Sequence, residues 1–437
     1  MTTLLAGAAQ VNMSPKDSQF LFGYPHAERY STGINDPLLS SALYLNNGQI
    51  AVIFIANDII FVSKKSVQRI REHIAAQTGI PTSHIMISAT HTHSGPITVD
   101  YISNEADRLI PKTDQKYVRF MEDKIVEAAV MAYKNTQPVR IGLAVADCTG
   151  IGTNRRSPDG PTDMNVPVLL VQNMAGTESI ACMLVCSMHP TVLHKDSKLV
   201  SGDFPAYARM YLQDHCLSAK CAILHHMGAA GNQSPRHVTK ENTFAEAQRL
   251  GQILGKAVEN VLPAIHFHTS VPIKCKQVQI DLPKRTFPSI AAAQEKLNNA
   301  VARLELLCKS SAPRQEVRTA ECDWFGAEET LTMARAVAEG RLSQVCREAL
   351  PAEIQIIKVG PWAFVGWQGE IFVDYALAVK KLFPNTYVIS CANGELQGYI
   401  VTKDADDEGG YEASNAILSY KSGDILVQKT AELLQTM

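Results

Sequence analysis

The sequence lacks the features that mark membrane-spanning and nucleic-acid-binding proteins. None of its segments approaches the length and apolar character of a transmembrane helix. Its 41 lysines and arginines are balanced by 43 aspartates and glutamates, which gives a formal charge of -2 with no long run of one sign. A nucleic-acid-binding surface would need a clustered excess of positive charge. We therefore expect neither a nucleic-acid partner nor a transmembrane segment.

Paired cysteines and a secretory leader are also missing. The ten cysteines include no Cys-x-x-Cys pair and lie mostly in apolar segments, as reduced core cysteines do. We expect no disulfide between Cys216 and Cys221, although they are close in sequence. Residues 1–11 have no basic stretch followed by a long apolar one, and they are predicted to form the first strand instead. Together these absences predict a cytoplasmic protein.

The chain is long enough to bury one large core or two joined ones, with 437 residues of which 46% are hydrophobic. Strand-like and helix-like segments alternate through a first lobe, about 1–265. The second lobe, about 266–437, is richer in strands and is interrupted by charged helical patterns at about 288–340, which form a helical insert. The pattern predicts an α/β fold of mixed sheets with flanking helices, without internal repeats.

Individual elements follow from hydrophobic spacing. The predicted helices are 66–76, 116–133, 203–215, 244–262, 289–310 and 327–338, and strands at 277–282 and 353–359 flank the insert. Asp203 follows Ser-Gly and is in a position to cap its helix. His266 and His268 alternate in what we interpret as an exposed strand, to which we assign no chemistry.

Two histidines follow one predicted strand. The apolar run 85–89 is followed by His91 and His93 and then by Ser-Gly-Pro. In an extended segment the i, i+2 spacing directs both imidazoles to one side. Histidine is a common zinc ligand and transfers protons near neutral pH. The pair therefore predicts a metal ligand with a proton-transfer partner beside it, with a solvated surface loop as the alternative.

Four further apolar runs end in polar residues in the same way. They lead into Ser187–Pro190, Gly228–Pro235, Gln368–Glu370 and Ala392–Gly394, the last continuing to Gly409–Glu412. In open α/β sheets, ligands bind outside the carboxyl ends of the strands, where such loops converge. Five similar strand ends predict one shared site more readily than five unrelated loops.

Each residue in these motifs also has a structural interpretation. His189 taken alone is typical of a buried, hydrogen-bonded histidine, and Glu370 could stabilise a helix N-terminus through the helix dipole. Tyr411 could simply pack, because a neutral phenol is a poor zinc donor. His225 and His226 lie within a strand pattern and are predicted to be structural. The polar segment containing Tyr24, His26 and Asp36 is interpreted as a surface loop, with pocket lining as the alternative.

Taken in order, the motifs resemble those of the neutral ceramidase family of zinc-dependent amidases. The similar segments are Thr90–Pro96, Met188–Pro190 followed by Ser201–Asp203, Gly231–Pro235, Gly369–Glu370, Gly398–Tyr399 and Tyr411–Ser414. The resemblance covers nearly the whole chain, although Gly-Asn-Gln-Ser-Pro replaces the family's Gly-Asp-Val-Ser-Pro. It implies a single catalytic module over residues 1–437, of neutral-ceramidase type with a helical insert.

The resemblance also implies roles for individual residues. Zn²⁺ would be bound by His91, His189, Glu370 and Tyr411. His93 would act as a proton shuttle beside the metal. Ser234 matches a serine that contacts the substrate or has been considered a nucleophile. Arg156 matches an arginine that holds the substrate or oxyanion, and the adjacent Arg155 is the alternative.

This ligand set suits amide hydrolysis, because zinc lowers the pKa of bound water from 15.7 to about 7 and three firm ligands leave an open position. Ser234 lacks the Gly-x-Ser-x-Gly elbow, so substrate binding is favoured over nucleophilic attack. We predict a zinc-dependent hydrolase of carbon–nitrogen amide bonds. A zinc-dependent esterase or lactonase and a non-catalytic lipid- or metabolite-binding homologue are the alternatives.

The chain departs from the family pattern in ways that bear on the substrate. It ends soon after the catalytic motifs, without room for the family's C-terminal immunoglobulin-like domain, and has no recognisable leader. These departures favour a small soluble amide over ceramide at a membrane surface. The sequence makes no prediction of oligomeric state.

Overall fold

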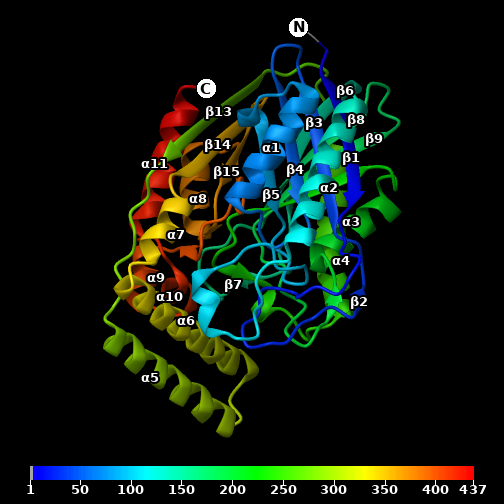
Figure 1. The fold of residues 1–437 in the computed structure, drawn as a ribbon. Coiled ribbons are helices and arrows are strands. Elements are labelled where there is room, and N and C mark those ends of the chain that lie inside the picture. The colour runs from blue at the N-terminus through cyan, green and yellow to red at the C-terminus, as the bar shows by residue number, and fades with distance from the viewer. Residues whose placement is uncertain (1–2) are drawn as a thin grey trace.

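The protein is described by a computed structural model that covers residues 3–437, and its core is formed by two sheets packed face to face (Figure 1). The first sheet contains β1 (Leu5–Asn12), β3 (Leu39–Asn46), β4 (Ala51–Asn57), β5 (Ile85–Ala89), β6 (Gln137–Asp147), β8 (Asn165–Asn173), β9 (Ser179–Cys186) and β11 (Ala222–Met227). Its strand order is β11-β9-β8-β6-β1-β3-β4-β5. The second sheet contains β13 (Ile273–Ile280), β14 (Ala352–Val359), β15 (Trp362–Trp367) and β17 (Thr386–Ile389), in that spatial order.

Both faces of the eight-stranded sheet are buried, which explains why its strands read as nearly continuous apolar runs. Side chains alternate between two cores: in β4, Phe54 packs toward the second sheet, while Ile53 and Ile55 pack toward helices. Strand β14 alternates in the same way, with Ile357 facing the first sheet and Ile356 facing the opposite side. The core between the sheets is therefore continuous across both halves of the chain.

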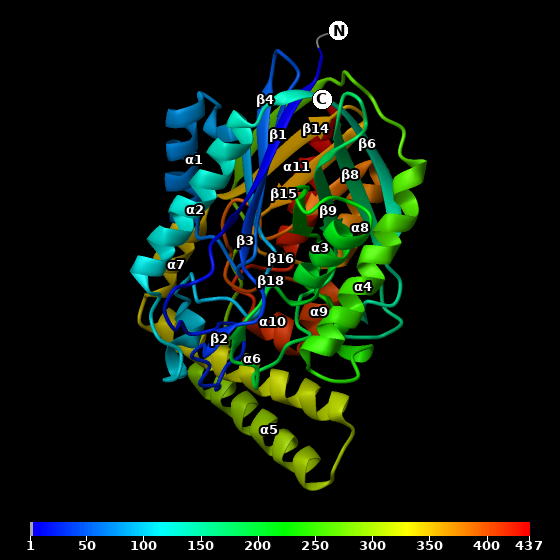
Figure 2. The same ribbon diagram turned by 90° about the vertical axis from the view of Figure 1, so that its right-hand side faces the viewer.

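Helices cover the outer faces of both sheets, which gives a four-layer arrangement (Figure 2). The first sheet is covered by α1 (Lys64–Thr78), α2 (Gln115–Lys134), α3 (Asp203–His215) and α4 (Phe244–Val261). The second sheet is covered by α7 (Leu342–Ala349), α8 (Val373–Leu382) and α11 (Lys421–Gln435). The short helices α9 (Lys403–Glu408) and α10 (Tyr411–Asn415) follow β17 in the chain. None of the described helices combines the length and apolar character needed to span a bilayer.

Local sequence explains why these helices form where they do. The side chain of Thr243 accepts a hydrogen bond from the Glu246 amide at the start of α4, in a Thr-x-x-Glu sequence typical of a capping box. Helices α3 and α4 approach closely because α4 carries glycine at their contact: a Cβ on Gly251 would lie 2.6 Å from Cβ of Tyr207. Helix α1 ends at Gly79, which adopts φ 74 and takes the left-handed cap.

The helical insert forms an antiparallel pair, α5 (Ile290–Lys309) and α6 (Arg314–Ala338). The pair lies at the end of the molecule opposite both termini, with α5 outermost (Figures 1 and 2). Only Ala293 of α5 is buried, whereas α6 buries a long face between α5 and the body of the protein. Helix α6 is therefore the part of the insert that contacts the rest of the molecule.

Three short strand pairs and four 3-10 turns lie among the loops. The pairs are β2 (Gly33–Ile34) with β10 (Leu199–Val200), β7 (Thr153–Asn154) with β12 (Gln233–Ser234), and β16 (Glu370–Ile371) with β18 (Tyr399–Ile400). The 3-10 turns are η1 (Thr82–His84), η2 (Ile102–Ala106), η3 (Pro235–His237) and η4 (Leu262–Ala264). The parallel pair of β16 and β18 places Glu370 opposite Tyr399.

The predicted α/β fold with mixed sheets and flanking helices is confirmed. Several local predictions are wrong. The N-cap of α3 is Gly202 rather than Asp203, and the strand predicted at 277–282 spans Ile273–Ile280. The helix predicted at 327–338 begins at Arg314, because its first half is held by packing against α5 and the body rather than by a regular apolar stripe. His266 and His268 do not lie in a strand; His268 forms an isolated bridge with Ile141 in β6. All ten cysteines are free, Cys216 and Cys221 included.

Strand β11 buries two adjacent histidines away from the strand ends. Nδ1 of His226 lies 2.7 Å from the Ser88 hydroxyl, whereas neither ring nitrogen of His225 has a partner in the described chain. Burial lowers the pKa of His225 to about 3, with a smaller contribution from the positive charge of Arg209. Both histidines therefore remain neutral parts of the core at physiological pH.

We expect His225→Leu to change how stability depends on pH. Unfolded histidine has a pKa of about 6.5, so below that pH the unfolded wild-type chain takes up a proton that folded His225 does not bind. The wild type therefore loses stability as pH falls from about 6.5 toward about 3, and the leucine variant lacks this loss. Urea unfolding should show the variant gaining about 2 kcal/mol relative to wild type between pH 7.5 and pH 5. A difference that stays constant across this range would contradict the assignment.

Candidate active site

The carboxyl ends of β5, β9 and β15 bring three polar side chains together. His91 follows β5, His189 follows β9, and Glu370 follows β15. Nε2 of His189 lies 2.9 Å from Oε2 of Glu370, and Nε2 of His91 lies 3.3 Å from the same oxygen. All three side chains are buried. Two strands of the first sheet and one of the second therefore supply a single cluster at the edge where both sheets end.

Each histidine near this cluster is oriented by a backbone carbonyl. Nδ1 of His91 lies 3.0 Å from the Ile60 carbonyl oxygen, Nδ1 of His189 lies 2.6 Å from that of Ala230, and Nδ1 of His93 lies 3.1 Å from that of Gly23. A carbonyl only accepts hydrogen bonds, so a neutral ring in each position carries its proton on Nδ1. The three Nε2 atoms are then left with lone pairs, the arrangement that orients metal-binding histidines.

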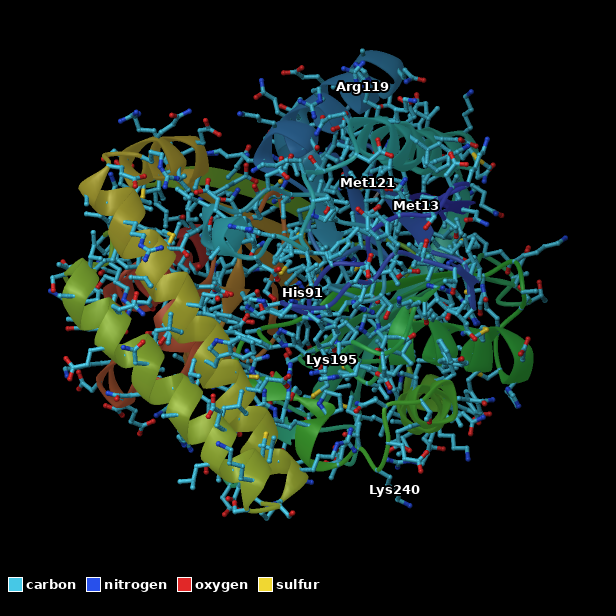
Figure 3. The ribbon with its side chains drawn as sticks, turned by 60° about the horizontal axis from the view of Figure 1, so that its bottom comes forward. Met13, His91, Arg119, Met121, Lys195 and Lys240 are labelled. Carbon is cyan, nitrogen blue, oxygen red and sulfur yellow. The ribbon has the colours of Figure 1, made fainter. Side chains whose placement is uncertain are left out.

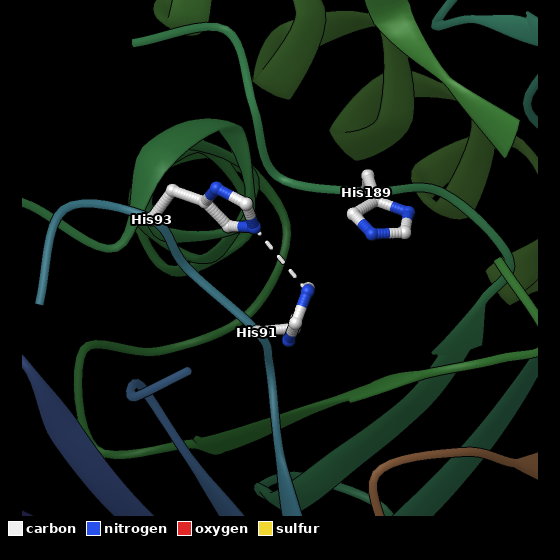
Figure 4. A group of neighbouring side chains, drawn as sticks. All are labelled: His91, His93 and His189. Atoms are coloured by element: carbon white, nitrogen blue, oxygen red, sulfur yellow. Dashed lines mark hydrogen bonds between the residues drawn. The ribbon is translucent and has the colours of Figure 1, made fainter. Parts of the chain in front are cut away.

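The three Nε2 atoms converge on one another (Figure 4). Nε2 of His91 lies 3.2 Å from Nε2 of His93, and ligand atoms of His91, His93 and His189 all lie within 4.8 Å of one another. Two lone pairs at this distance repel unless a proton or a cation lies between them. His91 also has φ 68, a left-handed backbone that a non-glycine residue adopts only at an energetic cost. A bound cation would relieve the repulsion between the Nε2 atoms of His91 and His93.

The charges of the cluster favour a cation. Burial alone would raise the pKa of Glu370, but the adjacent rings of His91 and His189 dominate and hold its pKa well below the usual value. Burial and, secondarily, the charge of Arg155 lower the pKa of His189 to about 4, and burial lowers that of His93 well below its usual value. The cluster thus contains one carboxylate and the neutral imidazoles of His189 and His93 beside His91. This donor set fits Zn²⁺.

Two adjoining cavities open onto the cluster. The inner cavity, of about 60 Å³, is bounded by His91, Glu370 and aromatic side chains, and the outer cavity holds about 350 Å³. Six residues line both cavities: Gly23, Tyr24, Pro25, His93, Tyr399 and Tyr411. Helix α6 forms one wall of the outer cavity, and Figure 3 shows the α5–α6 pair alongside the region of His91 and Lys195. The insert therefore contributes directly to the candidate site.

A model of the family described as neutral/alkaline non-lysosomal ceramidase, N-terminal, matches residues 6–235, more than half of the chain. The chain belongs to the neutral/alkaline non-lysosomal ceramidase family. This confirms the resemblance that the motifs predict. The matched region includes the strands that carry His91, His93 and His189 and extends to Ser234 and Pro235.

Two neutral ceramidases are similar to part of the chain. Neutral ceramidase A of Dictyostelium discoideum is 24% identical over 186 residues, which cover 39% of this chain and 26% of that protein. Neutral ceramidase B of the same organism is 26% identical over 211 residues, or 43% of this chain and 28% of that protein. The chain thus matches little more than a quarter of the length of these ceramidases.

Solved structures show the likeness of fold across nearly the whole chain. The crystal structure of neutral ceramidase from Pseudomonas aeruginosa superposes with a TM-score of 0.75 at 16% identity, over 98% of this chain and 73% of that chain. A ceramidase complexed with C2 gives the same TM-score and identity and is covered over 74% of its chain. The ceramidase fold therefore extends beyond residue 235 into the part that carries Glu370.

The structure brings most of the predicted site residues to the two cavities. His91, His93, His189 and Glu370 form the cluster itself. Tyr411, the first residue of α10, lines both cavities, and its ring lies 5.8 Å from that of Tyr399. Burial, followed by the nearby charge of Glu329, raises the pKa of Tyr411 well above its usual value. Its phenol is therefore protonated in the arrangement described.

The two candidate arginines differ in position. Arg155 is buried, lines the outer cavity and pairs with Glu412, with Nε 2.7 Å from Oε1. Arg156 lies outside the residues that line either cavity and pairs with Glu412 and the exposed Glu408. Burial acts to lower the pKa of Arg155, but Tyr399 and Glu412 together raise it above its ordinary value. The geometry therefore favours Arg155 as the arginine that faces the cavity.

Ser234 lines the outer cavity from the end of β12. Its hydroxyl accepts a hydrogen bond from the Arg236 amide at 3.3 Å and thereby caps η3. Among the described residues, no histidine is hydrogen-bonded to this hydroxyl, and His225 and His226 lie within β11 instead. Ser234 therefore lines the wall of the outer cavity and is not paired with a general base among the described residues.

The segment of Tyr24 is interpreted from its sequence as a surface loop with pocket lining as the alternative, and for Tyr24 the alternative is correct. Its side chain is buried, lines both cavities and donates a hydrogen bond to the Leu193 carbonyl at 2.8 Å. Other residues of the site were not predicted from sequence. Arg318 and Glu329 reach the cavities from α6, which no sequence motif connects to the site. Arg236 follows Ser234 by two residues and could have been found by the reasoning applied to the other strand ends.

Proposed function

We propose that this protein is a metal-dependent amide hydrolase in which His91, His189 and Glu370 hold Zn²⁺ and Tyr411 supplies a fourth oxygen near it. The observation that carries the proposal is the convergence of Nε2 of His91 and Nε2 of His189 on one carboxylate oxygen of Glu370, with both Nδ1 atoms held by carbonyls. Family membership supports an amide as the bond cleaved, because the named relatives are ceramidases.

A zinc ion bound by these residues supplies a water nucleophile near neutral pH and polarises the carbonyl that is attacked. The chain's own residues account for the rest of the chemistry. His93 is neutral, its Nδ1 is fixed by the Gly23 carbonyl and its Nε2 faces the cluster. It is placed to take a proton at Nε2 and to deliver it to the departing amine, as general acid–base catalysis requires.

Arg155 and Ser234 provide the polar wall around the scissile bond. A guanidinium aimed at a developing oxyanion contributes about 3 kcal/mol to transition-state stabilisation, and Arg155 already lines the cavity. The Ser234 hydroxyl can hydrogen-bond the bound amide. Burial of the cluster excludes bulk water, which strengthens each of these interactions.

Metal removal tests the proposal. We expect the purified protein to contain about one zinc per chain by elemental analysis, to lose hydrolysis of short N-acyl amides after dialysis against a chelator, and to regain it with added Zn²⁺. Matched esters measured alongside separate an amidase from an esterase. Unchanged amide hydrolysis in metal-free protein would refute the metal role, and zinc-loaded protein inert toward amides and esters would leave only a binding function.

Gly23→Ala tests the role of His93 without removing the imidazole. Gly23 has φ 117, and a Cβ at this position would overlap the His93 ring. We expect displacement of the ring and a fall in kcat of about 100-fold, the effect of misplacing a catalytic group by about 1 Å. Gly79→Ala is the matched control, because Gly79 also has a positive φ, 74, with no atom within 4 Å of its added Cβ. Equal kcat in the two variants would argue against positioning of His93.

A further inference from the structure

The outer cavity is lined by an unusual number of arginines. Arg155, Arg236, Arg314 and Arg318 line it, together with one acid, Glu321. Arg318 and Glu321 project from α6, whereas Arg155 and Arg236 come from the loops around β7 and β12. Cationic groups from the helical insert and from the main body therefore face the same space.

The acids near these arginines do not neutralise them. Glu321 is shared between Arg318, at 2.5 Å, and Lys195, at 2.6 Å. Glu412 is shared in the same way between Arg155 and Arg156. Within residues 3–437, Arg236 and Arg314 form no ion pair, and the Arg236 guanidinium has a 3.6 Å contact with the Cys322 sulfur. The cavity therefore carries a surplus of positive charge.

A second observation is independent of this charge count. Arg155 is only 7% exposed, and its Nη2 has no hydrogen-bond partner among the described residues. A buried, charged donor without a partner is costly, and this one belongs to a side chain that lines the cavity. The site is thus built with a donor that a ligand would satisfy.

The inner cavity differs from the outer one in size and in charge. Phe22, Ile60 and Phe61 line one part of it, the carboxylates of Glu329 and Glu370 line another, and its volume is only about 60 Å³. The metal-ligand cluster lies at its boundary with the cationic outer cavity, since His93 lines both. A substrate that spans the cluster therefore meets a small cavity lined by no arginine on one side and the arginines of the outer cavity on the other.

We propose that the substrate is an amide that carries a carboxylate or phosphate group, which binds among Arg236, Arg314 and Arg318 while Arg155 faces the scissile carbonyl, with a small group on the other side of the scissile bond. This inference rests on the proposed amide hydrolysis. Arginine is suited to the task because its planar fork binds carboxylates and phosphates with two parallel hydrogen bonds. The carbonyl oxygen of a neutral amide can accept a hydrogen bond from Arg155, but a neutral amide would leave the surplus positive charge of the cavity uncompensated.

Binding to metal-free protein tests the inference apart from catalysis. The probes are N-acetylglycine, N-acetyl-O-phosphoethanolamine and the neutral N-acetylethanolamine, which share one amide and differ in the group at its far end. With the full chain stripped of metal, so that no carboxylate can bind an ion, calorimetry should show at least one anionic probe binding about 10- to 100-fold more tightly than the neutral one. The stronger of the two anions identifies the group.

Variants separate the arginine cluster from general charge effects. Arg236→Gln and Arg318→Gln should each reduce the preference for the anion by about 10-fold. Arg335→Gln is the matched control, because Arg335 is an exposed residue of the same helix as Arg318 and lines neither cavity. Equal binding of all probes by wild type, or a preference retained by both cavity variants, would overturn the inference.

Hydrolysis by zinc-loaded protein separates failure of this inference from failure of the proposed function. We expect kcat/KM for the preferred anionic amide to exceed that for N-acetylethanolamine by about 10- to 100-fold. Equal hydrolysis of neutral and anionic amides would leave the hydrolase intact and overturn anion recognition. Selective binding without hydrolysis of any probe would refute the hydrolase and leave the cavity an anion-binding site.

Discussion

Replacing His189 by alanine should lower kcat for amide hydrolysis by about 10,000-fold and reduce bound zinc to a trace. Nε2 of His189 lies 2.9 Å from Oε2 of Glu370, and Nδ1 is held by the Ala230 and Gln233 carbonyls, so the substitution removes one of the two oriented imidazoles proposed to bind the metal. Loss of a metal that activates water and polarises the carbonyl costs several kcal/mol of barrier, and about 5 kcal/mol corresponds to this factor. Steady-state kinetics and elemental analysis measure both effects.

Two further variants make the result for His189 interpretable. His73→Ala removes an exposed imidazole from α1 and should change neither rate nor metal content. Glu370→Gln preserves the volume of the side chain while removing the charge that the cluster offers a cation, so it should also lose metal and activity. Full metal content in His189→Ala, with folding verified by circular dichroism, would exclude His189 as a ligand.

Sequence could predict those parts of the fold in which the hydrophobic pattern of a segment matches its burial in the tertiary structure. The strands that end at Ala89, Cys186 and Met227 are apolar on both faces because both faces are covered, so their runs and their abrupt polar ends are visible in the sequence. Histidines immediately beyond such ends could be assigned to one edge of a sheet, and the structure places His91 and His189 there.

The parts that sequence could not predict depend on packing between distant segments. The first half of α6 has no regular apolar stripe, yet its Arg318 side chain lies over the rings of Tyr24 and Phe325 and reaches the cavity. Tyr24 itself precedes a polar stretch that is typical of surface loops, and only the tertiary fold buries it. Spacing along the chain carries no information about the contacts of Tyr24, because they join it to Arg318 and Leu193, which are distant in sequence.

The choice between Arg155 and Arg156 also depends on the tertiary structure, because the sequence does not show which of two adjacent side chains faces the cavity. We expect Arg155→Gln to lower kcat by about 100- to 1,000-fold, the effect of losing one oxyanion donor, and to reduce the free energy of unfolding by about 3 kcal/mol, because buried Glu412 loses one of its two cations. Arg156→Gln should change kcat by no more than about threefold and cost about 1 kcal/mol, since its other partner, Glu408, is exposed.

A double variant separates the chemical role of Arg155 from its structural one. Arg155→Gln leaves the buried Glu412 carboxylate without one of its two cations, and Glu412→Gln removes that carboxylate. The combined variant should therefore regain most of the lost stability, because replacing both members of a buried ion pair costs less than removing one. Its kcat should stay low, because the guanidinium that faces the cavity is still absent. Urea unfolding and steady-state kinetics on the four variants give both quantities. Recovery of kcat together with stability would show that Arg155 acts only by holding Glu412 and α10 in place, and a larger loss of kcat in Arg156→Gln would reverse the assignment of the two arginines.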